Sequence, residues 1–284
     1  MPNLSSALVV AATLSIQPPV TSPPAQTTPS LQAAEQTPAT PKEPEPSKPL
    51  PEGATLYHTL TGRDAQVIFT SDAPLEKIIG KSNALAGFAV PGPKDSPASL
   101  SQAKWILPVR SLATGIPLRD QHLADKDWLD ADTAPNIEFV LSRVADIKEV
   151  KRGDGFSTWS ATLVGDMTIH AKVHEVTVKD ARLTFFKESA KTKSIAPGDL
   201  IFLKCDYTVK LSDFGISNGD VPSKVSDTVT IAQTLRLSNA TPQAIKDAQT
   251  APAKPAPKPP EDKRDEAPPT SEPAQTPSPK QPVP

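Results

Sequence analysis

The stretch RDQHLADKDWLDADTAPNIEF, residues 119–139, carries the pattern that decides the fold. Its first half is dense in charged and hydrogen-bonding side chains. Pro135 then leads into an apolar row that alternates at Ile137, Phe139 and Leu141. Asp favours helix N-termini and Pro favours bends, so the order predicts a short helical turn capped by Asp, a bend and a β-strand. Local physics alone indicates a segment packed across the end of a sheet.

Prolines and aromatic residues divide the 284-residue chain into three parts. Twelve of the 34 prolines lie in residues 1–51 and thirteen in residues 239–284, whereas all aromatic residues lie between Tyr57 and Phe214. A segment without aromatics that is rich in Pro, Ala, Thr, Glu and Lys cannot bury enough apolar surface to offset the entropy lost on ordering. We therefore predict one folded domain over 53–238, a disordered Pro-rich linker over 26–52 and a disordered Pro/Lys/Glu-rich tail over 239–284.

The apolar run LVVAATLSI, residues 8–16, is too short to span a bilayer. A region of small residues and prolines follows it, as after the apolar part of a secretory signal. The basic region that usually precedes such a run is missing, since the first Lys or Arg is Lys42. We predict a signal peptide over residues 1–25 and a periplasmic or secreted protein without a stable membrane span. The alternative is a disordered cytoplasmic N-terminus.

Charge and cysteine content narrow the classes of partner. The formal net charge is −2 and the isoelectric point is near 6.1, unlike the basic footprint of a nucleic-acid-binding protein. The single cysteine, Cys205, excludes an internal disulfide framework and a Cys-cluster zinc site. His170 and His174 have a spacing that could hold zinc on a helix, but here they fall in a strand and a turn, with no Glu after the first. We expect no metal, no cofactor and no nucleic-acid partner.

Alternating apolar and polar residues predict about eight antiparallel strands in simple succession, forming a barrel or a sandwich. The clearest row is Trp159, Ala161, Leu163, Gly165, Met167 and Ile169, all on one side of a strand. Asp154-Gly155 predicts the hairpin turn before it, and residues 171–174 the turn after it. We also expect a bulge near Asp180, where the apolar phase switches.

Two earlier segments have less regular patterns. Residues 71–93, SDAPLEKIIGKSNALAGFAVPGP, predict two short strands around a turn that contains Gly80. The next strand is expected to place Trp105, Leu107, Val109 and Ser111 on one face and to end before Gly115.

Three blocks of sequence together resemble the YceI-like family over about residues 55–238. Residues 114–139 contain R-D-x-H-L-x-x-x-D-W-L-D…P-x-I-x-F. Residues 165–178, GDMTIHAKVHEVTV, are similar to the family's G-D-L-T-I-H-G-x-x-x-x-V-x-L, with Ala171 in place of the common Gly. KLSDFGIS at 210–217 and VSDTVTI at 225–231 are similar to R-x-D-F-G-I…V-x-D-x-V-x-I. The opening differs, because DAQVIFTSDAPLEKIIGKSNALAG at 64–87 replaces the usual S-x-V-x-F-x-x-x-H.

This resemblance implies an all-β fold: a closed, antiparallel, eight-stranded lipocalin-like barrel with one short helix and an apolar lumen. It also implies non-catalytic binding, with sequestration or transport of a long-chain apolar ligand, an isoprenoid or a fatty amphiphile. Each buried CH₂ would contribute about 0.8 kcal/mol. The alternative is a secreted structural or adhesion β-domain on Pro-rich tethers, with a lumen filled by its own side chains. On either interpretation the Pro-rich tails are candidates for a position near a cell wall.

Candidate site residues follow from the inward faces of the expected strands. We expect Arg119, Asp120, His122 and Trp128 to form a structural loop across the barrel end. Asp120 and His122 could be an acid–base pair with Ser111 or Ser142, but no nucleophile elbow or Gly-rich oxyanion motif is present, so we expect no catalysis. The residues expected to face a ligand in the lumen are Phe69, Trp105, Leu107, Phe139, Trp159, Leu163, Met167, Ile169, Leu203, Cys205, Tyr207, Val209, Ile231 and Leu235.

Overall fold

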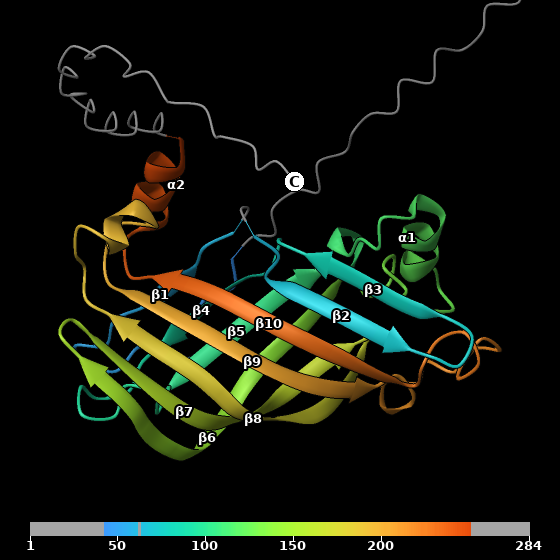
Figure 1. Cartoon of the computed structure of the whole chain (residues 1–284), viewed down its shortest axis with the longest axis horizontal. Coiled ribbons are helices and arrows are strands. Elements are labelled where there is room, and N and C mark those ends of the chain that lie inside the picture. Colours follow the sequence, from blue (N-terminus) through green and yellow to red (C-terminus); the bar gives the residue numbers. More distant parts are fainter. Residues whose placement is uncertain (1–42, 62–63, 251–284) are drawn as a thin grey trace, which may run out of the picture. The chain divides into compact units, whose positions relative to one another are not determined.

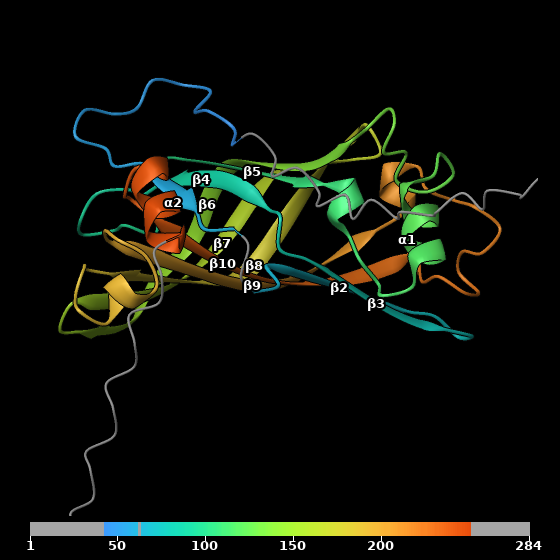
Figure 2. The same ribbon diagram turned by 90° about the horizontal axis from the view of Figure 1, so that it is seen from above.

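The computed structural model describes residues 43–61 and 64–250, and these form an antiparallel β-barrel with a helix near each end (Figures 1 and 2). The helices are α1, Pro117–Ala124, and α2, Pro242–Thr250. The strands are β1 Tyr57–Thr59, β2 Val67–Asp72, β3 Lys77–Ser82, β4 Ala86–Val90, β5 Gln102–Pro108, β6 Asn136–Gly153, β7 Phe156–Ile169, β8 Lys172–Phe186, β9 Leu200–Lys210 and β10 Thr228–Ser238.

Eight of these strands close into a ring, which confirms the predicted fold class. The ring order is β1-β4-β5-β6-β7-β8-β9-β10, and antiparallel pairing of β1 with β10 closes it. The β2–β3 hairpin departs from the expected simple succession, because β2 pairs with the first half of β10, beside β1. Two backbone hydrogen bonds of 2.9 Å between Lys81 and Ala113 tie β3 to the segment after β5. The hairpin therefore closes the half of the wall that β1 is too short to reach.

The long β6–β7–β8 meander follows the predicted alternation closely. Gly155 supplies a positive φ of 73° in the Asp154-Gly155 turn, and the inward row of β7 is buried. The expected bulge is confirmed: Asp180 has φ 53°, and the β7–β8 register shifts between Ala161 and Leu163. This extra residue lets β8 keep its apolar side chains inside on both sides of the phase switch.

Three local predictions were wrong in detail. Gly80 lies inside β3 rather than in a turn, because the ring of Phe69 on the paired strand occupies the space that a side chain would need. Val109 and Ser111 form a 3₁₀ turn after β5, which ends at Pro108. The turn between β7 and β8 consists of residues 170–171, both with positive φ, rather than 171–174.

Helix α1 begins differently from the prediction as well. Its N-cap is Ile116, with no side-chain cap, and Pro117 occupies the first helical position, where its missing N–H costs nothing. Asp120 instead accepts hydrogen bonds from the backbone N–H and the hydroxyl of Thr114, at 2.7 and 2.6 Å. The aspartate therefore fixes the approach to the helix rather than its first turn.

The predicted disordered segments are only partly described. Residues 242–250, inside the expected disordered tail, form α2, and Ile245 is buried against the barrel domain. At the other side, Glu43 accepts a 2.8 Å contact from His58. The predicted signal peptide over 1–25 lies outside the described residues, as do most of the linker and the tail.

Within the described ranges, no helix is long and apolar enough to cross a bilayer.

Candidate functional site: an apolar cavity in one half of the barrel

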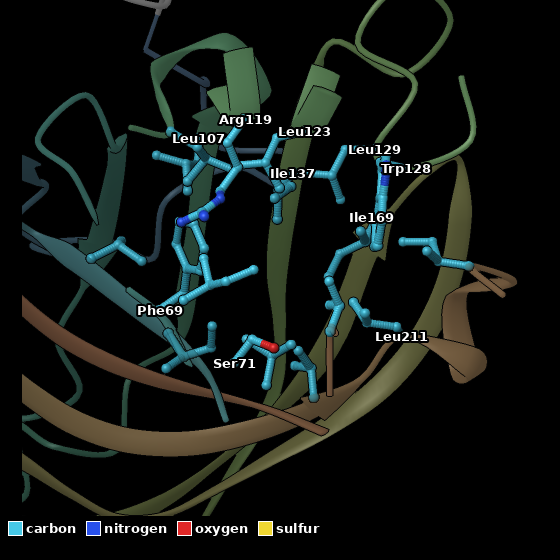
Figure 3. A pocket seen from close by; sticks show the side chains of 18 of the residues that line it. Phe69, Ser71, Leu107, Arg119, Leu123, Trp128, Leu129, Ile137, Ile169 and Leu211 are labelled. Atoms are coloured by element: carbon cyan, nitrogen blue, oxygen red, sulfur yellow. The ribbon is translucent and has the colours of Figure 1, made fainter. Parts of the chain in front are cut away.

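A cavity of about 420 Å³ occupies the half of the barrel nearest α1 (Figure 3). Its walls come from the inner faces of the strands, from α1 and from the segment between β9 and β10. The volume is in the range of small-molecule sites. We call this half the open end, since Ile116 and Leu118 line the cavity and are also exposed to solvent.

The other half of the barrel is filled by side chains. Trp159, Leu163, Leu183, Leu203 and Leu235 are all buried, and none of them lines the cavity. We call this half the packed end; the β6–β7 turn, the segment between β8 and β9, and α2 lie there (Figure 1). A bound molecule entering from the open end would therefore stop part-way along the barrel axis.

The fourteen expected lumen residues divide between these two halves. Five are buried but do not line the cavity: Trp159, Leu163, Leu203, Cys205 and Leu235. Nine line the cavity: Phe69, Trp105, Leu107, Phe139, Met167, Ile169, Tyr207, Val209 and Ile231.

The residues expected to form a structural loop lie at the cavity rather than merely over it. Arg119, His122 and Trp128 are part of its lining, and Figure 3 shows Arg119 extending from α1 across the upper part of the pocket. Trp128 lies beside Ile169, on the side of the pocket opposite Arg119. Only Asp120, which holds Thr114, is turned to the helix approach. The guanidinium of Arg119 donates to the carboxylate of Glu76 in the β2–β3 turn.

A second ion pair joins the polar groups at this opening. Lys224 and Asp220, both in the segment between β9 and β10, are 2.9 Å apart and line the cavity. The hydrogen bond that Lys224 donates to the carboxylate of Asp220 raises the pKa of Lys224. Among the described residues that line the cavity, Arg119 and Lys224 therefore each have a carboxylate beside them.

Deeper in the cavity the polar groups are few and neutral. The hydroxyl of Tyr207 donates to Oε1 of Gln233 at 3.3 Å, and burial raises the pKa of Tyr207 well above its usual value. The indole N–H of Trp105 is buried without a hydrogen-bond partner among the described residues. Among the described residues, none of the strand side chains that line the cavity is Asp, Glu, Lys or Arg, so the interior is suited to an uncharged molecule.

Comparison with known proteins agrees with this architecture. A model of the YceI-like domain matches residues 59–237. The chain belongs to the YceI-like family. No curated protein matches the sequence.

Several solved structures are similar to this YceI-like chain. Burkholderia cenocepacia BcnA is 23% identical with a TM-score of 0.46, over 62% of this chain and 96% of that one. A Campylobacter jejuni YCEI protein is 18% identical with a TM-score of 0.44, over 58% and 86%. A polyisoprenoid binding domain from Saccharophagus degradans, implicated in plant cell wall breakdown, is 16% identical with a TM-score of 0.42, over 65% and 98%.

Sequence reasoning missed part of the cavity wall of this YceI-like domain. The helix contributes Leu118 and Leu123, and the segment between β9 and β10 contributes Asp220, Lys224 and Val225. Leu118 and Leu123 are spaced by five residues on a short, weakly amphipathic helix, so no periodic signal marked them. The Asp220–Lys224 spacing was visible, but nothing in the sequence placed that segment at the barrel mouth.

Two glycine–aromatic pairs shape the wall. A Cβ on Gly80 would lie 2.1 Å from Cζ of Phe69, and one on Gly165 would lie 2.5 Å from Cζ of Phe139. Both rings are cavity-lining, so each glycine lets an aromatic ring lie flat against the sheet and leaves the space beyond it open. These glycines therefore contribute to the hollow of the open end.

The described part of the chain contains no cluster of three or more His, Cys, Asp or Glu residues that could hold a metal ion. His170 lies in the β7–β8 turn with φ 51°, while Nε2 of His174 approaches Asp213 at 3.6 Å.

Proposed function

We propose that this YceI-like domain binds one slender, largely apolar molecule in the cavity and sequesters or carries it without changing it chemically. The observation that carries the proposal is the continuous apolar cavity, which reaches the surface at the open end and is blocked by packed side chains at the other. Ligand classes that match this shape are isoprenoids and fatty amphiphiles, with the hydrocarbon inside and the polar group near the rim.

The energetics favour such a ligand over a polar one. Ten methylene groups moved from water into the cavity would contribute about 8 kcal/mol at roughly 0.8 kcal/mol each. Micromolar binding corresponds to about 8.2 kcal/mol, and association and ordering costs of at least about 4 kcal/mol reduce the gross value, so such affinity needs a chain clearly longer than ten methylenes. A short or highly polar molecule would gain too little from these walls.

Family membership supports the isoprenoid among these classes. The Saccharophagus degradans structure is described as a polyisoprenoid binding domain. We extend that ligand class to this chain because its cavity is narrow, apolar and open at one end.

Contacts at the polar groups support a role without catalysis. Asp120 is held by Thr114, and the hydroxyl of Ser111 donates to the carbonyl of Pro108 at 2.6 Å and lies 2.7 Å from Oγ of Ser82. These groups hold the segment before α1 together. Asp120 and Ser111, the candidate acid and the candidate nucleophile, therefore both make structural hydrogen bonds.

The alternative of a structural or adhesion module with a filled lumen describes the packed end alone. The open end retains a cavity, which a module of that kind would have no reason to keep. We therefore favour ligand binding, with the Pro-rich segments as tethers in a periplasmic or secreted location. Mass analysis of the mature N-terminus after expression would test the location, since a full-length cytoplasmic product contradicts it.

A matched pair of variants of the full chain tests ligand binding. Ile231 lines the cavity, whereas Val140 is exposed on the outside of β6. Delipidated protein is titrated with a long-chain isoprenoid alcohol and with a fluorescent fatty acid. We expect saturable 1:1 binding that Ile231→Trp weakens at least tenfold and Val140→Trp leaves within twofold. Equal affinities for the two variants, or no saturable binding by the parent, would contradict the proposal.

A further inference from the structure

Large apolar side chains are exposed at the open end of the barrel. Leu75 in the β2–β3 turn is 74% exposed, Leu118 on α1 is 61% exposed, and Ile79 on the outer face of β3 is 53% exposed. Ile116, just before α1, is 47% exposed. Single exposed aliphatic residues are ordinary on a protein surface, but a group of them at one place marks an interaction site.

Contacts of nearby residues hold the segments that carry these four side chains at one end of the barrel. Leu75 precedes Glu76 and Leu118 precedes Arg119, and the ion pair between Glu76 and Arg119 joins the two segments. The Lys81–Ala113 bridge ties β3, which carries Ile79, to the chain that leads into Ile116. Figures 1 and 2 both show α1 and the β2–β3 turn at the same end of the barrel. We call Leu75, Ile79, Ile116 and Leu118 the apolar rim.

The apolar rim is continuous with the interior of the barrel. Ile116 and Leu118 belong both to the exposed rim and to the cavity lining. Apolar surface therefore extends from the outside of the mouth into the cavity. Whatever covers the rim is in direct contact with the entrance that the ligand uses.

The charges around the rim indicate the kind of partner. Three ion pairs lie beside the rim: Arg119 with Glu76, Lys224 with Asp220, and Lys77 with Asp72 at 3.6 Å. This arrangement gives no strong field to attract a polyanion or a highly charged protein. A bilayer surface of zwitterionic lipids matches it, because leucine and isoleucine side chains bury in the interface while paired charges stay at headgroup level.

We propose that the open end docks onto a lipid bilayer through the apolar rim, so that the ligand moves between bilayer and cavity without crossing water. This inference rests on the proposed function, since it assumes that the cavity holds a lipid-soluble molecule. Leu75 and Ile79 would enter the interfacial region, and the Arg119–Glu76 pair would lie at the point where the ligand passes.

The test uses the delipidated full chain and vesicles of phosphatidylcholine in a flotation assay. The rim variant is Leu75→Asp with Ile79→Asp, because neither residue lines the cavity. The control is Val150→Asp with Ile195→Asp, which changes a strand residue that is 48% exposed and a loop residue that is 40% exposed at the packed end. We expect the rim variant to lower the vesicle partition coefficient roughly a hundredfold, about tenfold for each aliphatic side chain, with little effect of salt. The control should partition within twofold of the parent.

Ligand binding in the absence of vesicles separates this inference from the proposed function. Both variants should bind the isoprenoid alcohol in solution with parental affinity. If parent and rim variant partition equally, or the parent binds the ligand but not the vesicles, docking on a bilayer is wrong while ligand binding stands. If the rim variant instead abolishes a dimer seen in solution, the rim is an interface between two copies of the chain and the bilayer is not its partner. A parent that binds vesicles but takes up no ligand contradicts the proposed function.

Discussion

Adding a methyl group at Gly80 should distort the cavity wall through a single aromatic ring. Gly80 and Phe69 are paired across β3 and β2, and a Cβ at Gly80 would lie 2.1 Å from Cζ of the ring and 2.3 Å from Cε1. Ordinary van der Waals contact needs well over an ångström more. The ring must therefore leave the sheet surface and move toward the cavity that it lines.

The size and sign of the effect follow from that geometry. Overpacking of this kind costs about 1–3 kcal/mol, and in a domain of this size each kcal/mol lowers Tm by about 2–4 °C. Gly80 does not need a positive φ, so alanine itself is compatible with its strand backbone. In a Phe69→Ala background, Gly80→Ala should be neutral or stabilising by up to about 1 kcal/mol, because the obstruction is gone and the unfolded chain is less free.

The assay is a double-mutant cycle measured by urea unfolding, with isoprenoid titration on each variant. Gly80→Ala should also weaken ligand binding severalfold, since the displaced ring occupies cavity space. Gly219→Ala is the control, because a Cβ there would meet no atom within 4 Å and should change the free energy of unfolding little. Equal destabilisation by Gly80→Ala with and without the Phe69 ring would refute the reasoning.

Three further predictions separate the packed end, the rim and the buried thiol. Trp159→Ala should lower the free energy of unfolding by about 3–5 kcal/mol in chemical denaturation, because the side chain is buried at the packed end. The folded variant should keep its ligand affinity within twofold of the parent, and a loss of affinity would contradict the division of the barrel into two halves. Arg119→Gln should lower the free energy of unfolding by no more than about 1 kcal/mol, since the ion pair with Glu76 is partly exposed. It should speed ligand release severalfold in a stopped-flow transfer assay, and an unchanged rate would show that the ion pair does not restrict the opening of the cavity. Burial raises the pKa of the Cys205 thiol to about 12 from 9. As the pH rises, the thiol therefore ionises in the unfolded protein before it ionises in the folded protein. The free energy of unfolding should fall between about pH 9 and pH 12, by roughly 1 kcal/mol at pH 10. Cys205→Ala should lack this part of the loss, and identical pH profiles for the two proteins would argue against a buried neutral thiol.

The regular strands were predictable because their side chains alternate over many residues. The inward row of β7, the Asp154-Gly155 turn and the bulge at Asp180 each depend on local backbone preference and a half-buried face, and the structure has all three. Gly80 was misplaced because its role depends on Phe69, eleven residues earlier, and a glycine in isolation predicts a turn.

The extent of the cavity was not predictable in the same way. Inward-facing residues such as Leu163 and Met167 have identical patterns along β7, but one is in the packed core and the other lines the cavity. Alternation reports which face of a strand is inside and carries no information about how far a hollow extends along the barrel. The rim was also hidden, because Glu76 and Arg119 are 43 residues apart and meet only through the closed fold.

Native mass spectrometry of the full chain tests the central claim most directly. The protein is delipidated with organic solvent, refolded or exchanged into volatile buffer, and mixed with a long-chain isoprenoid alcohol or a fatty acid. We expect a 1:1 complex for the parent and for Val140→Trp, with little or none for Ile231→Trp. A parent protein that stays ligand-free at saturating concentration, or a cavity-filled variant that binds as well as the parent, would contradict it.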